Sequence, residues 1–157
     1  RGLILPPKGS EEGSNDVMGY RLHGDLFNAL DVVGTGQALA VVPVNPPEPW
    51  VKTPGLNLVV ALSDPHNLGA CLRTAEAMGV AQVVLTKECA SPFLPRALRA
   101  ASGSTFRLKL ASAPSLKELD LAGSGGQVFG LDLEGENLYN FVWPRDAVLI
   151  VGEEGQG

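Results

Sequence analysis

A strand pattern that leads directly into a helix pattern is the feature that most limits how this chain can fold. Leu56–Leu62 reads LNLVVAL, a short apolar run that is typical of a buried strand. After a polar loop, apolar side chains recur at helical spacing over Leu68–Met78. Asn67 is predicted to cap the start of this helix and Gly79 to end it. This succession indicates an α/β fold.

The same alternation continues along the rest of the sequence. Further strands are predicted over Gln82–Thr86, Phe106–Leu110, Gln127–Leu131 and Ala147–Val151, and further helices over Pro95–Ala101 and near Ser115–Leu119. Short apolar strands that alternate with helices are typical of parallel sheets, because parallel neighbours need a crossover connection. We therefore predict a parallel sheet that helices cover on both faces.

The first third of the chain has a different character. Arg1–Asp16 is predicted to be a loop, Asp25–Leu30 a short helix, and Ala38–Val44 a strand that Pro43 either restricts to a sheet edge or ends. Five prolines then fall within Pro43–Gly55, and such a stiff, extended stretch is typical of an interdomain linker. We divide the chain into a partial N-terminal domain (1–46), a linker (47–55) and an α/β domain (56–157).

Composition restricts the kinds of function. A formal net charge of −5 argues against a protein that binds nucleic acid through overall charge alone, which leaves a local basic face open. No apolar run approaches the roughly 18 residues that a membrane span needs. The two cysteines and two histidines lack the spacing of a disulfide framework or a metal site. We therefore expect no membrane, no metal and a reducing compartment, cytoplasmic or, in a eukaryote, mitochondrial.

Three polar residues follow the first strand of the predicted sheet: Asp64, Asn67 and Arg73. Each alone has an ordinary explanation, as a turn residue, a helix cap and a solvated side chain. Open parallel sheets, however, place their ligands beyond the carboxyl ends of the strands, where these three residues are predicted to lie. Their company there makes them candidates for a binding or catalytic site.

The last predicted strand leads into a glycine-rich loop, Gly152–Gly157, with the sequence GEEGQG. Its glycines allow the backbone to approach a ligand closely. The loop matches no phosphate-binding fingerprint, and the carboxylates of Glu153 and Glu154 would repel phosphate. The loop therefore favours a ligand with hydroxyl groups or positive charge, such as a nucleoside or a sulfonium, with a plain turn as an equal alternative.

A basic segment lies between these two features. Arg96, Arg99, Arg107 and Lys109 gather within a short stretch of an otherwise acidic chain. Such a cluster is either a solvated helix face or a surface that contacts phosphates. The second interpretation would give the chain the local basic face that its overall charge lacks.

The three features occur in an order that resembles one protein family. DPHNLGACLRTAEAMGV (64–80), RALRAASGSTFRLKL (96–110) and LIVGEEGQG (149–157) resemble the first motif, the segment after it and the second motif of the SpoU (TrmH-like) branch of the SPOUT RNA methyltransferases. The resemblance implies a parallel sheet with a trefoil knot, usually in a homodimer. It also implies methyl transfer from S-adenosylmethionine to a ribose 2′-hydroxyl of rRNA or tRNA.

The resemblance also assigns residues by position. Asn67, Arg73 and Glu154 fall on catalytic positions of the family. Because a guanidinium keeps its proton above pH ~12, we expect Arg73 to hold an RNA phosphate and to stabilise the developing alkoxide rather than to act as a base. Asn67 would orient the hydroxyl or Arg73, and Glu154 would fix the loop or accept the proton.

The remaining assignments concern the cofactor and the RNA. Leu131, Gly152 and Gly155 fall on cofactor-contacting positions, and Arg96, Arg99 and Arg107 of the basic segment are predicted to bind RNA. Glu153 departs from the family, which more often carries Asn, Ser or Ala at this position.

A second departure is that the family's third motif, a Ser-Leu-Asn stretch that completes the knot and the cofactor pocket, does not occur in these 157 residues. We therefore expect the intact protein, rather than this chain alone, to be active. An RNA-binding pseudoenzyme of the same fold is the main alternative. A flavodoxin-like or dinucleotide-binding domain is disfavoured, because no glycine fingerprint follows the first strand.

Overall fold

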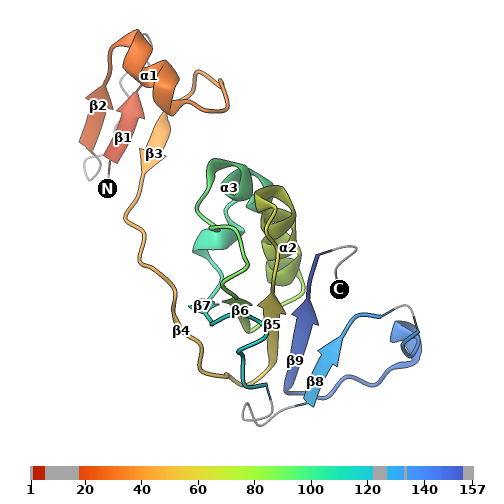
Figure 1. Cartoon of the computed structure of the whole chain (residues 1–157). Helices are drawn as coiled ribbons and strands as arrows, with labels where there is room; N and C mark the ends of the chain where they lie inside the picture. The colour runs from red at the N-terminus through yellow and green to blue at the C-terminus, as the bar shows by residue number, and fades with distance from the viewer. Residues whose placement is uncertain (1, 6–17, 122–126, 133, 154–157) are drawn as a thin grey trace. The chain divides into compact units, whose positions relative to one another are not determined.

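The computed structural model describes residues 2–5, 18–121, 127–132 and 134–153 (Figure 1). Contacts divide the chain into two compact units, Arg1–Pro46 and Pro47–Gly157. We describe each unit by itself.

The first unit contains a small sheet and one short helix. Its elements are β1 (Gly2–Leu5), β2 (Met18–Arg21), α1 (Gly24–Leu30) and β3 (Leu39–Val41). β1 lies in the centre, parallel to β2 and antiparallel to β3. The predicted helix and the predicted edge strand are confirmed. The loop predicted over Arg1–Asp16 is wrong at β1, where pairing with a strand on each side outweighs the punctuation by Pro and Gly that follows.

The second unit contains a six-stranded sheet among its described residues, and all of its strand pairs are parallel. The order is β4-β7-β6-β5-β9-β8. The strands are β4 (Glu48–Pro49), β5 (Leu56–Val60), β6 (Gln82–Leu85), β7 (Leu110–Ser112), β8 (Gln127–Gly130) and β9 (Ala147–Val151). The predicted α/β class with a parallel sheet is confirmed.

Two cores cover the two faces of this sheet. On one face, the helices α2 (Pro65–Ala77) and α3 (Pro95–Ala101) pack their apolar side chains against β5 and β6. On the other face, Trp50 and residues of the stretch 113–121 pack against the valines of the central strands. Within the described residues the second face is therefore covered by the Pro-rich segment and a turn rather than by a helix. The trefoil knot stays a prediction.

Part of the Pro-rich segment forms an edge strand of this sheet instead of a linker without contacts. β4 pairs with β7, and the backbone N–H of Trp50 donates to the carbonyl of Ser112 over 2.8 Å. Proline is tolerated here because β4 is an edge strand.

The central helix begins at a different cap from the one predicted. Asp64 is the N-cap of α2, and its side chain accepts a hydrogen bond from the backbone N–H of Asn67. The prediction of Asn67 as the cap is therefore wrong. Pro65 explains the difference, because proline is favoured at the first helical position and so places the cap at the residue before it, Asp64. Gly79, with φ at +70°, ends the helix as predicted.

A close approach between α2 and α3 fixes the position of the helix that carries Asn67. Gly69 is buried against α3, and a Cβ atom added there would lie 2.3 Å from the carbonyl oxygen of Ala97. The helices can therefore pack this tightly only because residue 69 has no side chain.

Two predicted elements between α3 and β8 are wrong. The strand predicted over Phe106–Leu110 is a 3₁₀ turn, η1 (Ser104–Phe106), followed by β7, because Ser102 and Gly103 both take positive φ and turn the chain. The helix predicted near Ser115–Leu119 is a turn. There the carboxylate of Glu88 accepts the hydroxyl of Ser115 and the N–H of Leu116, which stabilises the turn over a helix.

Candidate ligand site at the carboxyl edge of the sheet

The sheet has a switch point between β5 and β9. From β5 the chain proceeds through α2 to β6 and then through α3 to β7, and both strands lie on one side of β5. β9 lies on the other side of β5. At such a point the loops after two neighbouring strands diverge, which creates a crevice where ligands bind. A cavity of about 420 Å³ lies there, lined by Leu62, Asn67, Gly152 and Glu153.

Asn67 presents a polar side chain to this cavity. Its backbone N–H donates to Asp64 Oδ1 over 2.9 Å, and this bond holds the pKa of Asp64 below its ordinary value. Because Asp64 performs the capping, the carboxamide of Asn67 is exposed and makes no hydrogen bond to any described residue. The amide can therefore donate to and accept from a ligand.

The loops on the two sides of the cavity are joined by a hydrogen-bonded pair. Glu153 Oε1 accepts from the backbone N–H of Ser63 over 2.6 Å and also from the Ser63 hydroxyl. These bonds hold the pKa of Glu153 below its ordinary value. Sequence reasoning found Glu153 as a loop carboxylate and as a departure from a motif, but not its contact with Ser63, because a partner ninety positions away leaves no local signal.

The structure does not bring Arg73 into contact with Asn67. Arg73 lies on α2 six positions further along, which corresponds to about 9 Å of rise and about 120° of rotation. Its exposed guanidinium forms no hydrogen bond or ion pair with the described residues. Both residues are therefore open to a ligand, on different sides of the same helix.

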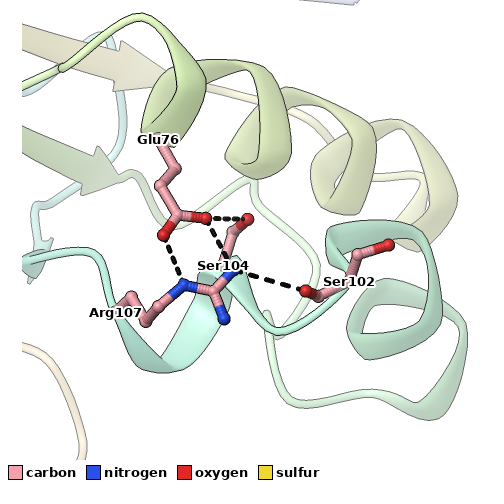
Figure 2. A network of polar contacts seen from close by, with 4 residues as sticks. All are labelled: Glu76, Ser102, Ser104 and Arg107. Atoms are coloured by element: carbon pink, nitrogen blue, oxygen red, sulfur yellow. Dashed lines mark hydrogen bonds and ion pairs between the residues drawn. The ribbon is translucent and has the colours of Figure 1, made fainter.

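The basic segment divides into free and engaged arginines. Arg96 and Arg99 are exposed on α3, and the positive charge of Arg96 contributes to the lowered pKa of Asp64, which places Arg96 near the start of α2. Arg107, in contrast, forms an ion pair with Glu76 (Figure 2).

Figure 2 shows that Glu76 is the centre of a wider network. Arg107 Nη2 donates to Glu76 Oε2 over 2.8 Å and to the Ser102 carbonyl over 3.4 Å, and Ser104 Oγ donates to Glu76 Oε2 over 2.5 Å. The bonds from Arg107, followed by that from Ser104, lower the pKa of Glu76 to about 2. This network fastens η1 to the end of α2 that lies away from Asn67.

A second cavity, of about 630 Å³, lies beside the end of β8. Leu131 follows β8 directly, is exposed and lines this cavity, as do the carboxylate side chains Asp132 and Glu136. The rings of Phe129, Phe141 and Trp143 line it too and meet edge to face, with centroids 5.1–5.2 Å apart.

Sequence reasoning found only Leu131 of this group. The available signal was the gathering of aromatic residues in a chain that is only 6% aromatic. Of the other predicted residues, Gly152 follows β9 and lines the first cavity, whereas Glu154 and Gly155 lie outside the described residues.

Two features are absent from the part of the chain that the structure describes. No group of three or more His, Cys, Asp or Glu side chains there is placed to hold a metal ion. No helix there is long and apolar enough to cross a membrane.

An open parallel sheet with exposed polar and glycine residues at its switch point defines an α/β domain with a candidate ligand site. Residues 56–157 match the model of the SpoU rRNA Methylase family, and the chain belongs to this family. The predicted family relationship is therefore confirmed.

Two curated relatives are similar at the level of sequence. One is named ribosomal RNA small subunit methyltransferase G 2, from Syntrophobacter fumaroxidans, and is 35% identical over 160 residues, which cover 99% of this chain and 31% of the relative. The other is the 23S rRNA (guanosine(2553)-2'-O)-methyltransferase RlmP of Bacillus subtilis, 35% identical over 141 residues, which cover 88% of this chain and 56% of the relative. The chain thus spans about a third to somewhat over half of their lengths.

A solved structure shares the fold. The SpoU methyltransferase AviRb from Streptomyces viridochromogenes, in complex with the cofactor AdoMet, aligns with a TM-score of 0.74 at 20% sequence identity. The alignment covers 100% of this chain and 67% of AviRb.

Proposed function

We propose that the intact protein transfers a methyl group from S-adenosylmethionine to a ribose 2′-hydroxyl of ribosomal RNA. The observation that carries the proposal is the match of residues 56–157 to the SpoU rRNA Methylase family. The name of the Bacillus subtilis relative supports the 2′-hydroxyl and ribosomal RNA, and the AviRb complex supports the cofactor. Transfer RNA, which the sequence left open as a substrate, stays the alternative.

The two cavities suit a nucleoside-containing cofactor. The cavity beside β8 has a volume within the roughly 300–1,000 Å³ of small-molecule sites, and its aromatic rings offer an apolar surface to a base. The carboxylates of Asp132 and Glu136 can accept hydrogen bonds from ribose hydroxyls. Leu131, Gly152 and Gly155 are proposed to contact the cofactor, which supplies an activated methyl group on a sulfonium.

Asn67 at the first cavity, together with Arg73 and Glu154, would align and activate the ribose. The hydroxyl oxygen attacks the methyl carbon while the carbon–sulfur bond breaks and its electron pair stays on sulfur, so alignment accounts for much of the rate. The carboxamide of Asn67 is proposed to hold the hydroxyl, and Arg73 to hold a neighbouring phosphate and the developing alkoxide charge. Glu154 is proposed to fix its loop or to accept the proton.

Arginines on α3 would contact the RNA backbone. Arg96 and Arg99 are exposed, and Arg96 lies near the start of α2, so they supply positive charge that an acidic chain otherwise lacks. The N–H groups of Arg107 at Nε and Nη2 are engaged by Glu76, so the proposed RNA contact of Arg107 would use Nη1.

Of the further parts of the proposal, the RNA-binding domain and the homodimer rest on the family resemblance, whereas the linker rests on its prolines and the cytoplasmic location on the two isolated cysteines. Residues 1–46 would be part of an RNA-binding domain, residues 47–55 the connection to the catalytic domain, and the intact protein a cytoplasmic homodimer. The first unit of the structure ends at Pro46, where this division places its boundary.

The test measures methyl transfer and cofactor binding by the intact protein. Labelled S-adenosylmethionine and unmodified ribosomal RNA should yield a ribose-methylated nucleotide, detected by mass spectrometry of nuclease digests. Calorimetric titration with S-adenosylmethionine separates the alternatives, because an absence of measurable binding would leave only the RNA-binding pseudoenzyme.

The role of Arg73 is tested in the same assay. Arg73→Lys keeps the charge but loses the planar fork, so we expect kcat to fall about tenfold or more. Arg145→Lys is the matched control, because Arg145 is an exposed arginine just before β9, at the opposite edge of the sheet. If Arg73→Lys is as active as the wild type, the bidentate role is wrong.

A further inference from the structure

The contact between Glu153 and Ser63 connects two segments that are far apart in sequence. Glu153 follows β9 by two positions, and Ser63 lies in the loop that follows β5. Because β5 and β9 are parallel neighbours, with Val60 opposite Val151, both loops leave the same edge of the sheet. The Glu153 side chain then reaches across and accepts both the N–H and the hydroxyl of Ser63.

Ser63 is directly connected to the cap of α2. The next residue, Asp64, accepts the N–H of Asn67 over 2.9 Å. A continuous series of hydrogen bonds and one peptide link therefore runs from Glu153 through Ser63 and Asp64 to Asn67. Asn67 and Glu153 line the same cavity, so the series ends at the backbone of the residue whose carboxamide is available to a ligand there.

The charges around Glu153 explain why this contact needs good hydrogen bonds. The carboxylate of Asp64 is close enough to oppose ionisation of Glu153, whereas the two bonds from Ser63 favour the ionised form and prevail. Arg96 and His66 offset part of the charge on Asp64. Ser63 thus holds a carboxylate at the cavity that its acidic neighbour would otherwise disfavour.

We propose that Glu153 is a positioning residue of the methyl-transfer site, which holds the loop after β5 through Ser63 and thereby sets the carboxamide of Asn67. This inference rests on the proposed function. Glu153 acts through another residue and is not assigned a contact with the reacting atoms. Its effect should therefore appear in the chemical step and not in the affinity for cofactor or RNA.

A second carboxylate provides a matched comparison. Glu88 accepts the Ser115 hydroxyl and the Leu116 N–H, so it makes the same kind of contact with a serine and a backbone amide. Glu88 does not line either of the two cavities described above. Glu88→Ala should thus reproduce the loss of a loop contact without touching the site.

The first experiment compares steady-state kinetics of the intact protein. Glu153→Ala should lower kcat about ten- to hundredfold, because misplacement of an aligning group by about 1 Å has effects of this size. KM for RNA and Kd for S-adenosylmethionine should stay within twofold of wild type. Glu153→Gln keeps an oxygen that accepts from Ser63, so it should restore kcat to within about threefold, and Glu88→Ala should leave kcat unchanged.

A double variant tests whether the effect passes through Ser63. Ser63→Ala removes the hydroxyl but keeps the N–H, so its own loss of kcat should be smaller than that of Glu153→Ala. If the two side chains act as a pair, adding Ser63→Ala to Glu153→Ala should change kcat by less than twofold. Fully multiplicative losses would contradict an action through Ser63.

Amide hydrogen exchange without RNA separates this inference from the proposed function. Glu153→Ala should speed exchange at the N–H groups of Ser63 and Asn67, and Glu88→Ala should not. If wild type transfers no methyl group, the proposed function fails, whereas unchanged exchange in Glu153→Ala overturns the contact itself. Faster exchange with unchanged kcat, or a selective loss of cofactor affinity, would overturn the positioning role.

Discussion

Two asparagines at opposite ends of β5 have opposite surroundings. Asn57, near the amino end, is fully buried. Its Oδ1 accepts a hydrogen bond from the Thr53 N–H over 3.2 Å. Its Nδ2 donates to the Thr53 carbonyl over 2.7 Å and to the Gly55 carbonyl over 3.2 Å. Asn67, beyond the carboxyl end, is exposed on a cavity, and its side chain bonds to no described residue.

The difference lies in what the chain does on each side of the strand. Before β5 the Pro-rich segment turns back through Gly55, with φ at +95°, and encloses Asn57. After β5 the side chain of Asp64 caps the helix, which leaves the amide of Asn67 unused. The same residue type therefore serves the fold at one edge of the sheet and is available to a ligand at the other.

Asn57→Ala should have the largest effect on stability. The substitution leaves the Thr53 N–H and the Thr53 carbonyl without their side-chain partner in a half-buried setting, at about 1–3 kcal/mol for each group that stays unsatisfied. We expect the free energy of unfolding to fall by about 3 kcal/mol in urea titrations with an unchanged m-value. Asn140→Ala, at an exposed asparagine, is the control and should change it by less than about 0.5 kcal/mol. Equal effects would mean that the Asn57 network contributes nothing specific.

The sequence predicted the helices and strands on which the two asparagines lie, but not the contacts of their side chains. The bounds of α3 and β9 were predicted correctly, because a proline at the first helical position and a β-branched run are local signals. The cap at Asp64 was also signalled, by Pro65, and was missed because Asn67 is an equally good capping residue.

Other features had no local signal. The burial of Asn57 depends on a segment that folds back on it, and the contacts of Glu153 and Glu76 join residues that are distant in sequence. A contact between residues distant in sequence also explains why no strand starts at Phe106, since Glu76 holds η1 in place through Arg107. Pattern reasoning therefore found which loops meet at the sheet edge, but not which side chains there are engaged.

Gly69→Ala tests whether the cavity end of α2 is held as firmly as the amino edge of the sheet. The new Cβ would meet the Ala97 carbonyl at 2.3 Å, and neither backbone can yield without separating α2 from α3. We expect a loss of about 1–3 kcal/mol in the free energy of unfolding. Gly24→Ala is the control, because a Cβ there meets nothing within 4 Å. A neutral Gly69→Ala would show that the helix carrying Asn67 is loosely seated.

Asn67→Ala should separate function from stability most clearly. No described residue loses a hydrogen bond from the side chain, so the free energy of unfolding should stay within about 0.5 kcal/mol of wild type. Methyl transfer by the intact protein should fall about 100-fold, the size of effect seen when one aligned donor is removed from a reaction site. A stable variant with full activity would contradict the proposed role, and a destabilised one would place Asn67 in the same class as Asn57.

Glu76 lies at the other end of α2 from Asn67 and should behave as a residue engaged by the fold. Its pKa is lowered from 4.5 to about 2, first of all by the hydrogen bonds from Arg107. A carboxyl with a depressed folded-state pKa contributes stability that is fully present above its unfolded value and is lost as the pH falls toward the folded value. The contribution of Glu76 should therefore disappear between about pH 4.5 and pH 2.

Glu76→Gln removes this titration, so the free energy of unfolding should fall less steeply with acid in that window than it does for wild type. The slope should not vanish, because the hydrogen bond from Ser115 also lowers the pKa of Glu88 to about 2. Urea titrations at several pH values measure the slope. Arg107→Gln should flatten it similarly, and combining the two substitutions should add little, since both remove one interaction. A wild-type slope in Glu76→Gln would mean that the exposed ion pair is screened by solvent.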